Sequence, residues 1–354
     1  MLSAAPHRFP VALPVVVSTD ADAATWTRFV DAHRDASVYH MYRWRDVFER
    51  AFGHRTEYLM ARRGRIVVGV LPLVEFRSWW FGRFMVSLPF VNYGGVLAVE
   101  REAARALLET AHRLAAERGL AHVELRHRDP QFPGSPSKSH KVAMKLALAG
   151  DPDAMWSALD RKVRNQVRKA EKSDLSCAIG GEELVDEFYP VFATNMRDLG
   201  TPVYAKKFFT EVVSIFHERT TVFVVRKGTQ AIGAGIAIRH RESVEMPWAS
   251  SLKAYRALCA NNLLYWSVIK HAIATGARTF DFGRSTPDEG TYHFKKQWGA
   301  EAESLCWEYA LTNGRSVPDQ SPKNPKFALA IRMWKRLPLA VAGLVGPPIV
   351  RSIP

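Results

Sequence analysis

The stretch TFDFGRSTPDEGTYHFKKQWGAE, Thr279–Glu301, carries the signals of a strand, a turn and a helix within one short segment. Alternating aromatic residues predict a strand over 278–282, which Gly283 is expected to end. The segment 284–290 is rich in residues that interrupt regular structure and predicts a polar turn. One or two helical turns are then expected over 292–298. The stretch therefore predicts a strand edge, a flexible turn and a helix start in succession.

The helical part of this stretch places an aromatic ring and two cations on one side. Tyr292, Lys295, Lys296 and Gly299 follow each other at helical spacing. Together with the strand edge and the turn, these groups predict a pocket for an anionic substrate. The alternative interpretation is a solvated turn that leads into an ordinary amphipathic helix.

Length and composition indicate a globular protein of two domains. The chain has 354 residues, of which 47% are hydrophobic and 24% charged; this is enough for buried cores and excludes a disordered chain. Its net charge of +14 favours nucleic acid, phosphorylated small molecules, acidic polysaccharide or an anionic membrane surface as a partner. The simpler alternative is that the charge keeps the protein in solution.

The cysteines favour a reducing compartment, and we expect a cytoplasmic protein. Cys177, Cys259 and Cys306 form no CxxC pair and have no His/Cys ligand spacing. A disulfide framework or a zinc site is therefore unexpected, and we predict no metal. The N-terminus has no signal-peptide layout, and no apolar run reaches the ~20 residues that span a bilayer.

The longest apolar run is the C-terminal segment Leu339–Val350. Arg332, Lys335 and Arg336 come just before it, so this tail can make peripheral contact with the inner face of a membrane. Packing against the protein is the alternative, and we expect it.

Hydrophobic periodicity predicts an α/β (α+β) chain. In the first half we expect helices at 22–35, 42–52 and 100–118, strands at 15–17, 57–62, 66–73, 122–126 and 141–148, and an aromatic loop over 76–100. In the second half we expect helices at 155–172, 182–199 (broken or kinked at Pro190), 206–219, 261–275 and 327–336, and strands at 175–179, 220–226, 231–239, 243–249, 278–282 and 304–311. This order favours a mostly antiparallel sheet with helices on both faces.

A polar segment at 149–153 predicts a domain boundary. The first domain would comprise residues 1–150 and the second 151–311. Residues 312–354 would form a Pro-rich linker with a basic helix and the apolar tail.

The helix predicted over 155–172 has an apolar face and a cationic face. Its apolar positions share one side: Leu159, Val163, Val167 and Ala170. Six cations lie opposite or beside them, and only Asp160 and Glu171 offset them within the helix, so i,i+4 ion pairs do not account for the run. We expect this helix to face the same cleft as the pocket and to bind substrate through Lys162, Arg164, Arg168 and Lys172. An ordinary solvated basic face is the alternative.

DFGRSTPDEGTYHFKKQWGAE together with KVRNQVRKAEKSDL (Lys162–Leu175) resembles the FemAB family, the non-ribosomal aminoacyltransferases of peptidoglycan bridge formation. More narrowly, the chain is similar to the FemAB-related proteins of exosortase/PEP-CTERM exopolysaccharide systems. Three further segments carry the narrower resemblance: FYPVFATNMRDLGTP (Phe188–Pro202), MPWASSLKAYRALCANNLLYW (Met246–Trp266) and SLPFVNYGG (Ser87–Gly95). The resemblance covers nearly the whole chain and is strongest between Gly150 and Tyr309.

The resemblance implies two tandem GNAT-like domains, each a mixed, mostly antiparallel sheet flanked by helices, with substrate in a cleft. Members of the founding family move an aminoacyl group from aminoacyl-tRNA to an amine of a peptidoglycan precursor. Their FKxxF/W-G segment near the reaction site corresponds to Phe294, Lys295, Trp298 and Gly299, and their basic helix corresponds to Arg161–Lys172.

Acyl transfer needs a proton acceptor for the nucleophile, stabilisation of an oxyanion, and two substrates held together. Our catalytic candidates are Lys295 for the oxyanion or a phosphate, Asp281 as a base or orienting carboxylate, and Tyr292 as a hydrogen-bond donor or stacking surface. A cap or turn role is the alternative for Asp281. Further substrate-binding candidates are Arg284, Lys296, Arg197, Tyr204, Trp248, Asn261 and Asn262.

The segment Arg256–Asn261 bears on the donor. An acetyl-CoA-dependent GNAT carries a R/Q-x-x-G-x-G/A loop there, whose glycines let backbone N–H groups approach the pyrophosphate. Here the arginine is present and both glycines are missing. We therefore expect no bound cofactor and a donor that is aminoacyl-tRNA or another activated acyl compound.

From these observations we expect an acyltransferase that forms an amide on a cell-envelope glycan or peptidoglycan precursor. The first rival keeps the fold but uses acyl-CoA or an acyl carrier to acylate an exopolysaccharide sugar. The second rival is a non-catalytic basic module that binds RNA, a nucleotide-linked precursor or an anionic glycan.

Overall fold

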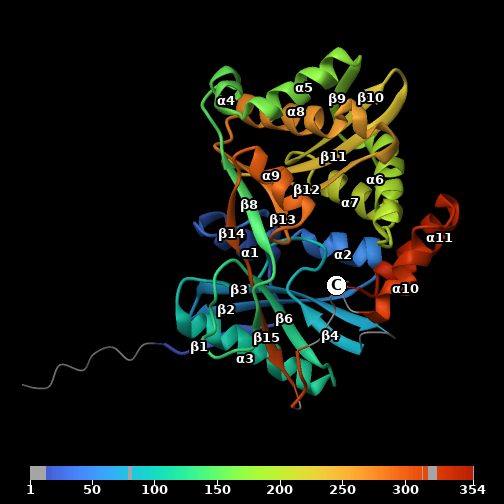
Figure 1. The fold of residues 1–354 in the computed structure, drawn as a ribbon. Coiled ribbons are helices and arrows are strands. Elements are labelled where there is room, and N and C mark those ends of the chain that lie inside the picture. Colours follow the sequence, from blue (N-terminus) through green and yellow to red (C-terminus); the bar gives the residue numbers. More distant parts are fainter. Residues whose placement is uncertain (1–12, 79–81, 313, 318–324, 354) are drawn as a thin grey trace, which may run out of the picture.

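The computed structural model describes residues 13–78, 82–312, 314–317 and 325–353. They form two lobes, each built on one β-sheet with helices against it (Figure 1). No helix within these residues is both long and apolar enough to cross a bilayer. The expected α/β class, with mixed and mostly antiparallel sheets flanked by helices, is confirmed.

The sheet of the first lobe has the strand order β1-β2-β3-β4-β6-β15-β7, and β5 pairs with β3 beside this path. Its neighbours are antiparallel except β4 and β6. Helix α3 (Arg101–Glu117) covers one face, and α1 (Ala23–Ala32) packs on the other through Trp26. The strands are β1 (Val15–Ser18), β2 (Arg55–Arg63), β3 (Ile66–Ser78), β4 (Gly82–Val86), β5 (Leu97–Ala98), β6 (His122–His127), β7 (Ser137–Lys138) and β15 (Cys306–Leu311).

The sheet of the second lobe has the order β14-β8-β13-β12-β11-β10-β9, and only β12 and β13 are parallel. Along β10, Phe223 and Val225 face the core under α5 and α8, whereas Val222 and Val224 face the core under α6 and α7. The strands are β8 (Val142–Ala147), β9 (Leu175–Gly180), β10 (Thr220–Lys227), β11 (Gln230–His240), β12 (Ser243–Ser251), β13 (Thr279–Ser285) and β14 (Glu301–Ser304). The helices are α4 (Pro152–Ala158), α5 (Arg161–Lys172), α6 (Val185–Leu199), α7 (Lys206–Ile215), α8 (Ala260–Ala274) and α9 (Gly290–Gln297).

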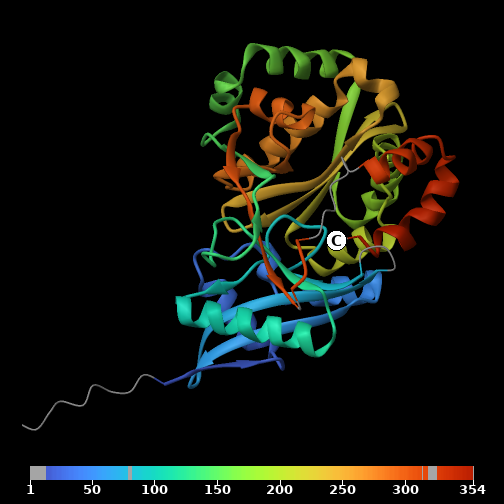
Figure 2. The ribbon, with the colours of Figure 1, turned by 60° about the horizontal axis from the view of Figure 1, so that its bottom comes forward.

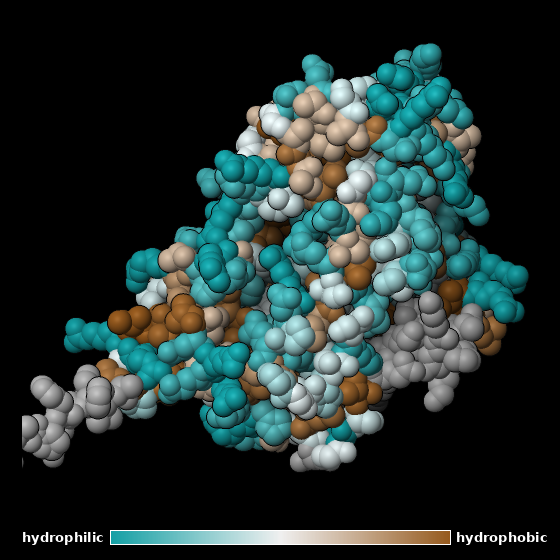
Figure 3. Space-filling model, turned by 60° about the vertical axis from the view of Figure 1, so that its left-hand side comes forward, coloured by the Kyte–Doolittle hydropathy of each residue, from teal (hydrophilic) through white to brown (hydrophobic). Residues whose placement is uncertain are grey.

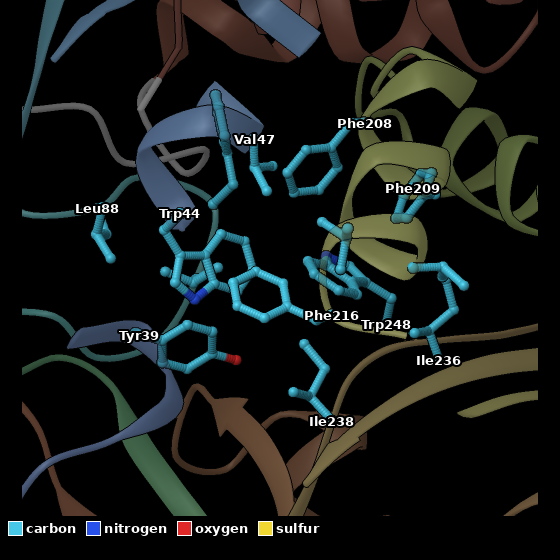
Figure 4. Packing of buried hydrophobic residues seen from close by; sticks show 14 of the residues in the cluster. Tyr39, Trp44, Val47, Leu88, Phe208, Phe209, Phe216, Ile236, Ile238 and Trp248 are labelled. Carbon is cyan, nitrogen blue, oxygen red and sulfur yellow. The ribbon is translucent and has the colours of Figure 1, made fainter. Parts of the chain in front are cut away.

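The largest hydrophobic core joins the two lobes (Figure 4). Helix α2 (Trp44–Phe52) of the first lobe packs against α7 of the second. The Trp44 ring lies 5.0 Å from that of Phe216, and Phe208 meets Trp248 edge-on at 5.3 Å, both measured between ring centroids. Because each of these side chains is buried, the lobes share one interior.

A two-stranded ribbon carries the chain between the lobes. The chain leaves the first sheet after β7 and enters the second at β8; it returns from β14 to β15 with only Leu305 between them. β14 pairs with β8, β15 pairs with β7, and the Leu305 N–H donates to the carbonyl of Lys141 (3.0 Å) where they cross. The strand predicted over 304–311 is β15 for all but its first two residues, and Ser304 belongs to β14 in the other sheet. The division into domains 1–150 and 151–311 stays a prediction. The first segment contributes β8 to the sheet of the second lobe, and the second segment contributes β15 to the sheet of the first lobe.

Two C-terminal helices, α10 (Pro325–Trp334) and α11 (Leu339–Val350), lie beside the second lobe (Figures 1 and 2). α11 contacts α6. Its Ala342, Gly346 and Val350 are buried. The tail therefore packs on the protein through one of its faces.

The aromatic segment 76–100 is more regular than predicted. β3 continues through it to Ser78, and β4 follows, with Phe84 and Val86 buried. Both faces of the sheet are covered here, so its strands are apolar on both sides. Such strands lack the alternation of apolar and polar residues that marks a strand in the sequence. The prediction of a loop was wrong for these residues; the structure describes nothing of 79–81.

Two predicted helices also differ from the structure. The helix over 155–172 is interrupted after α4, and the Asp160 carboxylate accepts a backbone N–H at the start of α5 (2.6 Å), which caps the second helix. We expected a break or a kink at Pro190; a break does not occur, because α6 runs through the proline. Phe188 and Val191 hold α6 in the core on both sides of the proline, and this packing outweighs the missing hydrogen bond.

Candidate active site

The candidate site begins where β12 and β13 separate. These parallel strands pair over only three residues, the last pair being Glu245 and Asp281. Beyond this point β12 contains Pro247, which has no N–H to donate. β13 continues past Gly283, where the sequence predicted its end, and this glycine has φ +73° at a register shift. The two carboxylates therefore lie side by side at the branch point of the sheet.

A turn from the first lobe closes over these carboxylates. The Tyr93 hydroxyl donates to one oxygen of Asp281 (2.6 Å), and the other accepts the N–H of Gly283 (2.8 Å). The Asn92 amide donates to Glu245. A Cβ atom at Gly283 would lie 3.3 Å from the Asn92 amide nitrogen, so the glycine admits the turn. The site is thus assembled from both lobes.

Burial raises the pKa of both carboxyls, so the pair resists losing both of its protons. Burial first, and then the charge of Asp281, raise the pKa of Glu245 to about 8. Burial also raises the pKa of Asp281, although the hydrogen bonds from Tyr93 and Gly283 oppose this. Two adjacent buried carboxyls cannot both ionise cheaply. Because Asp281 accepts these two hydrogen bonds and has two lysines nearby, it is the one that ionises first.

Lys295 lies behind this pair, on α9. Its side chain is buried, and its Nζ donates to the backbone carbonyls of Gly283 (3.1 Å) and Arg284 (3.0 Å). Burial lowers the pKa of Lys295 to about 8, and the charges of Asp281 and Glu245 oppose that shift. The lysine therefore fixes the irregular part of β13 and puts a positive charge near Asp281.

A cavity of about 720 Å³ opens onto the two carboxyls. Tyr93, Glu245 and Asp281 are among its lining residues. The Arg128 guanidinium lies over the Tyr93 ring, 4.6 Å from its centroid, and Lys145 pairs with Glu303 at the rim. Further cations line the cavity: Arg34, Arg241 and Arg278. β8 and β14 lie on the side of the molecule that Figure 3 brings forward, where hydrophilic side chains predominate. The acids Glu242, Glu301 and Glu303 also line it, so the cavity has an acidic floor and a rim of mixed charge.

The structure distributes the residues predicted from the Thr279–Glu301 stretch over three places. Asp281 lines the cavity, and Lys295 lies beneath it. Arg284 turns toward Trp307, with its guanidinium 5.6 Å from the ring centroid and its Nη1 buried without a partner. Tyr292 is half-buried against the core of the second lobe, and Lys296 is exposed.

The basic helix does not reach this cavity, and the expectation that it shares the cleft was wrong. α5 packs on α8 and β9, on the outside of the second lobe. Its apolar positions are buried as predicted. Arg168 lies over the Trp156 ring (5.4 Å to the centroid). The binding of substrate by Lys162, Arg164 and Lys172 on this outer face stays a prediction.

The remaining substrate-binding candidates are engaged within the protein. Trp248 and Tyr204 pack against Phe208 and Phe209. Arg197 pairs with Asp198 and donates to the Leu337 carbonyl (3.4 Å), and the Asn262 amide donates to Gln166 (3.1 Å). Asn261 is half-buried beside it. None of this set lines the cavity.

Sequence reasoning missed Asn92, Tyr93 and Glu245. Asn92 and Tyr93 contributed only to the family resemblance through the segment Ser87–Gly95, and their partners lie 153 and 188 residues away. Glu245 did carry a local signal, because it is an acid inside the otherwise apolar run between Val244 and Trp248. A charge at such a position is rarely buried without a partner.

Residues 157–296 match the family described as Acetyltransferase (GNAT) domain. Among solved structures, the fold is similar to that of FemX, with a TM-score of 0.61 at 14% identity over 82% of this chain and 96% of that one. It is also similar to the C-terminal domain (DUF2156) of a proposed lysylphosphatidylglycerol synthetase from Agrobacterium fabrum, with a TM-score of 0.56 at 12% identity over 84% and 93% of the two chains. A tandem GNAT protein from the clavulanic acid biosynthesis pathway gives 0.54 at 14% identity over 85% and 99%. No curated protein matches the chain.

These likenesses define the fold of the protein and the family match of one domain. At identities this low the comparisons show similarity of fold alone. The fold is that of two GNAT-like lobes in tandem. The family match lies within the second lobe and includes β12, β13 and most of α9. Residues 157–296 match a GNAT acetyltransferase domain, and the FemAB-like fold that the resemblance implied is confirmed.

Proposed function

We propose that the protein transfers an aminoacyl or other acyl group to an amine of a cell-envelope glycan or peptidoglycan precursor, in the manner of the FemAB family. The observation that carries this proposal is the buried Glu245–Asp281 pair, which faces a cavity between two GNAT-like lobes. The resemblance to proteins of exosortase/PEP-CTERM systems makes an exopolysaccharide component the narrower acceptor.

In this proposal the carboxyl pair moves the protons of acyl transfer. The acceptor nitrogen forms a bond to the acyl carbon and gives a proton to ionised Asp281. The bond from that carbon to the donor oxygen then breaks, and protonated Glu245 gives its proton to the leaving hydroxyl. Proton transfer of this kind contributes roughly 10²–10⁴-fold to a rate. The positive charge of Lys295 helps to keep Asp281 ionised between turnovers.

The donor is proposed to be aminoacyl-tRNA or another bulky activated acyl compound. Between β12 and α8, the segment Arg256–Asn261 contains no glycine, and Cys259 occupies the left-handed position at the start of α8. Side chains there crowd the approach of a pyrophosphate to the helix N-terminus. The net charge of +14 suits a polyanionic donor. The proposed location is the cytoplasm, where such donors are made.

The assay that tests the site measures transfer of a radiolabelled acyl group to an amine acceptor with the full-length chain. Asp281→Asn should lower kcat by roughly 10²-fold or more, because the amide cannot take up a proton. Glu301→Gln is the matched control, since Glu301 lines the same cavity and is exposed. Equal rates for Asp281→Asn and wild type would refute the site.

The donor is tested separately by isothermal titration. Aminoacyl-tRNA should bind with an affinity that falls steeply as salt rises, whereas CoA should bind weakly. Tight binding of CoA would overturn the tRNA donor in favour of the acyl-CoA rival, and it would leave the site assignment to the transfer assay.

A further inference from the structure

Helix α11 packs on the second lobe with one face and turns larger apolar side chains outward from the other. Along α11, Ala342, Gly346 and Val350 are buried. A Cβ atom at Gly346 would lie 3.0 Å from the backbone nitrogen of Val203, so the helix approaches as closely as a glycine permits. On the opposite side Leu344 is 78% exposed.

We call the large apolar residues of the two C-terminal helices that are at least 40% exposed the outer apolar face. Its members are Leu329 and Met333 on α10, and Val341, Leu344 and Val345 on α11. On α11 they recur at spacings of three and four residues, which places them on one stripe. An amphipathic helix of a soluble protein buries its larger apolar side chains. The inverted arrangement of α11 indicates that the outer apolar face has a partner of its own.

The charges beside this face are of one sign. Arg332 is exposed just before Met333. Lys335 and Arg336 are exposed in the segment between Met333 and α11. The sequence contains no acidic residue after Asp319. Cations that flank an exposed apolar stripe complement anionic lipid headgroups above an acyl layer.

The two helices are held firmly enough to present this face. The Arg197 guanidinium donates to the carbonyl of Leu337 in the turn between them (3.4 Å). Ile331 and Lys335 close on Gly200, where a Cβ atom would lie 2.6 Å from the Ile331 side chain. The outer apolar face is therefore part of the folded protein, and its exposure does not arise from a loose end.

We propose that the outer apolar face of α10 and α11 docks on an anionic lipid surface. Its apolar side chains would enter the boundary between headgroups and acyl chains, and the three cations would contact the headgroups. A second copy of this chain is a poorer occupant, because self-association would bring like charges together. This proposal does not depend on the proposed acyl transfer.

Co-sedimentation of the full-length protein with vesicles tests this proposal. We expect binding to phosphatidylcholine vesicles that contain about 30% phosphatidylglycerol and little binding to phosphatidylcholine alone. Leu344→Glu should weaken the binding at least roughly tenfold. The triple variant Arg332→Gln, Lys335→Gln, Arg336→Gln should weaken it on the order of a hundredfold and remove its salt dependence.

The matched control is Ile66→Glu, which places the same charge on an apolar residue that is 71% exposed on β3. It should bind vesicles as wild type does. Loss of binding in Ile66→Glu equal to that in Leu344→Glu would overturn the proposal, as would absence of wild-type binding to the anionic vesicles. A dimer seen by light scattering that Leu344→Glu dissociates would assign the face to a second copy and would also overturn it.

Discussion

We expect the free energy of unfolding of the wild-type protein to fall as the pH rises from about 5 to 8. Replacing Glu245 by glutamine should remove most of this loss. The pKa of this buried carboxyl rises from its ordinary value of 4.5 to about 8. The unfolded chain therefore releases the proton near pH 4.5, while the folded protein keeps it until about pH 8. Stability falls over this window because the unfolded state gains from ionisation. At about 1.4 kcal/mol per pH unit, the penalty reaches about 5 kcal/mol above pH 8.

Urea unfolding followed by tryptophan fluorescence measures this effect. Glutamine keeps the shape of the side chain, and its amide oxygen can accept the hydrogen bond from Asn92. The Glu245→Gln variant should therefore gain about 4 kcal/mol relative to wild type on going from about pH 5 to pH 8.5. The Glu301→Gln control, at an exposed carboxylate, should follow the wild-type curve. Parallel curves for wild type and Glu245→Gln would refute the assignment of a protonated acid at this position.

Three further predictions concern the fold and the site. His122 is buried, and its pKa is lowered from 6.5 to about 4, so the free energy of unfolding should fall as the pH drops below 6.5. In urea unfolding, His122→Phe should lose about 2 kcal/mol less stability than wild type between about pH 7.5 and pH 5. An equal loss in both proteins would contradict this. Gly95→Ala would place a Cβ atom 2.0 Å from the His127 ring and should cost about 1–3 kcal/mol in thermal unfolding, whereas Gly150→Ala, in open space, should cost little; equal costs would show that the turn can relax. Lys295→Met removes a charge that lowers the pKa of Asp281, so the acidic limb of the kcat/KM profile should move to higher pH; a limb that stays in place would rule out this coupling.

Most of the fold could be predicted because its elements carry strong local patterns. The strands β10 and β11 and the helix α8 match their predicted bounds within a residue or two, since alternation or an apolar helical run marks each. β4 and the run of helix through Pro190 could not be predicted in this way. Their conformations depend on layers that cover them from elsewhere in the chain, and tertiary packing overrides local preference.

The site could be predicted only in part, for a related reason. Asp281 and Lys295 lie in one local stretch, and their residue types and spacing are enough to indicate chemistry there. Glu245 and Tyr93 join Asp281 through strand pairing and a contact between lobes, and the order of residues along the chain does not bring these groups together. The prediction that the cations of α5 share the cleft was wrong because a basic stripe indicates an anionic partner but does not indicate which side of the protein the stripe faces.

The ribbon between the lobes has a consequence for how the molecule can be cut and how it can move. A fragment that ends at residue 150 would keep β8 without its partners β13 and β14, and it would leave β6 without β15. Neither half would then possess a complete sheet, so the two lobes are expected to be inherited, folded and degraded together. Opening of the cavity by a swing of the lobes would have to twist two paired strands. We therefore expect substrates to enter a gap of nearly constant width.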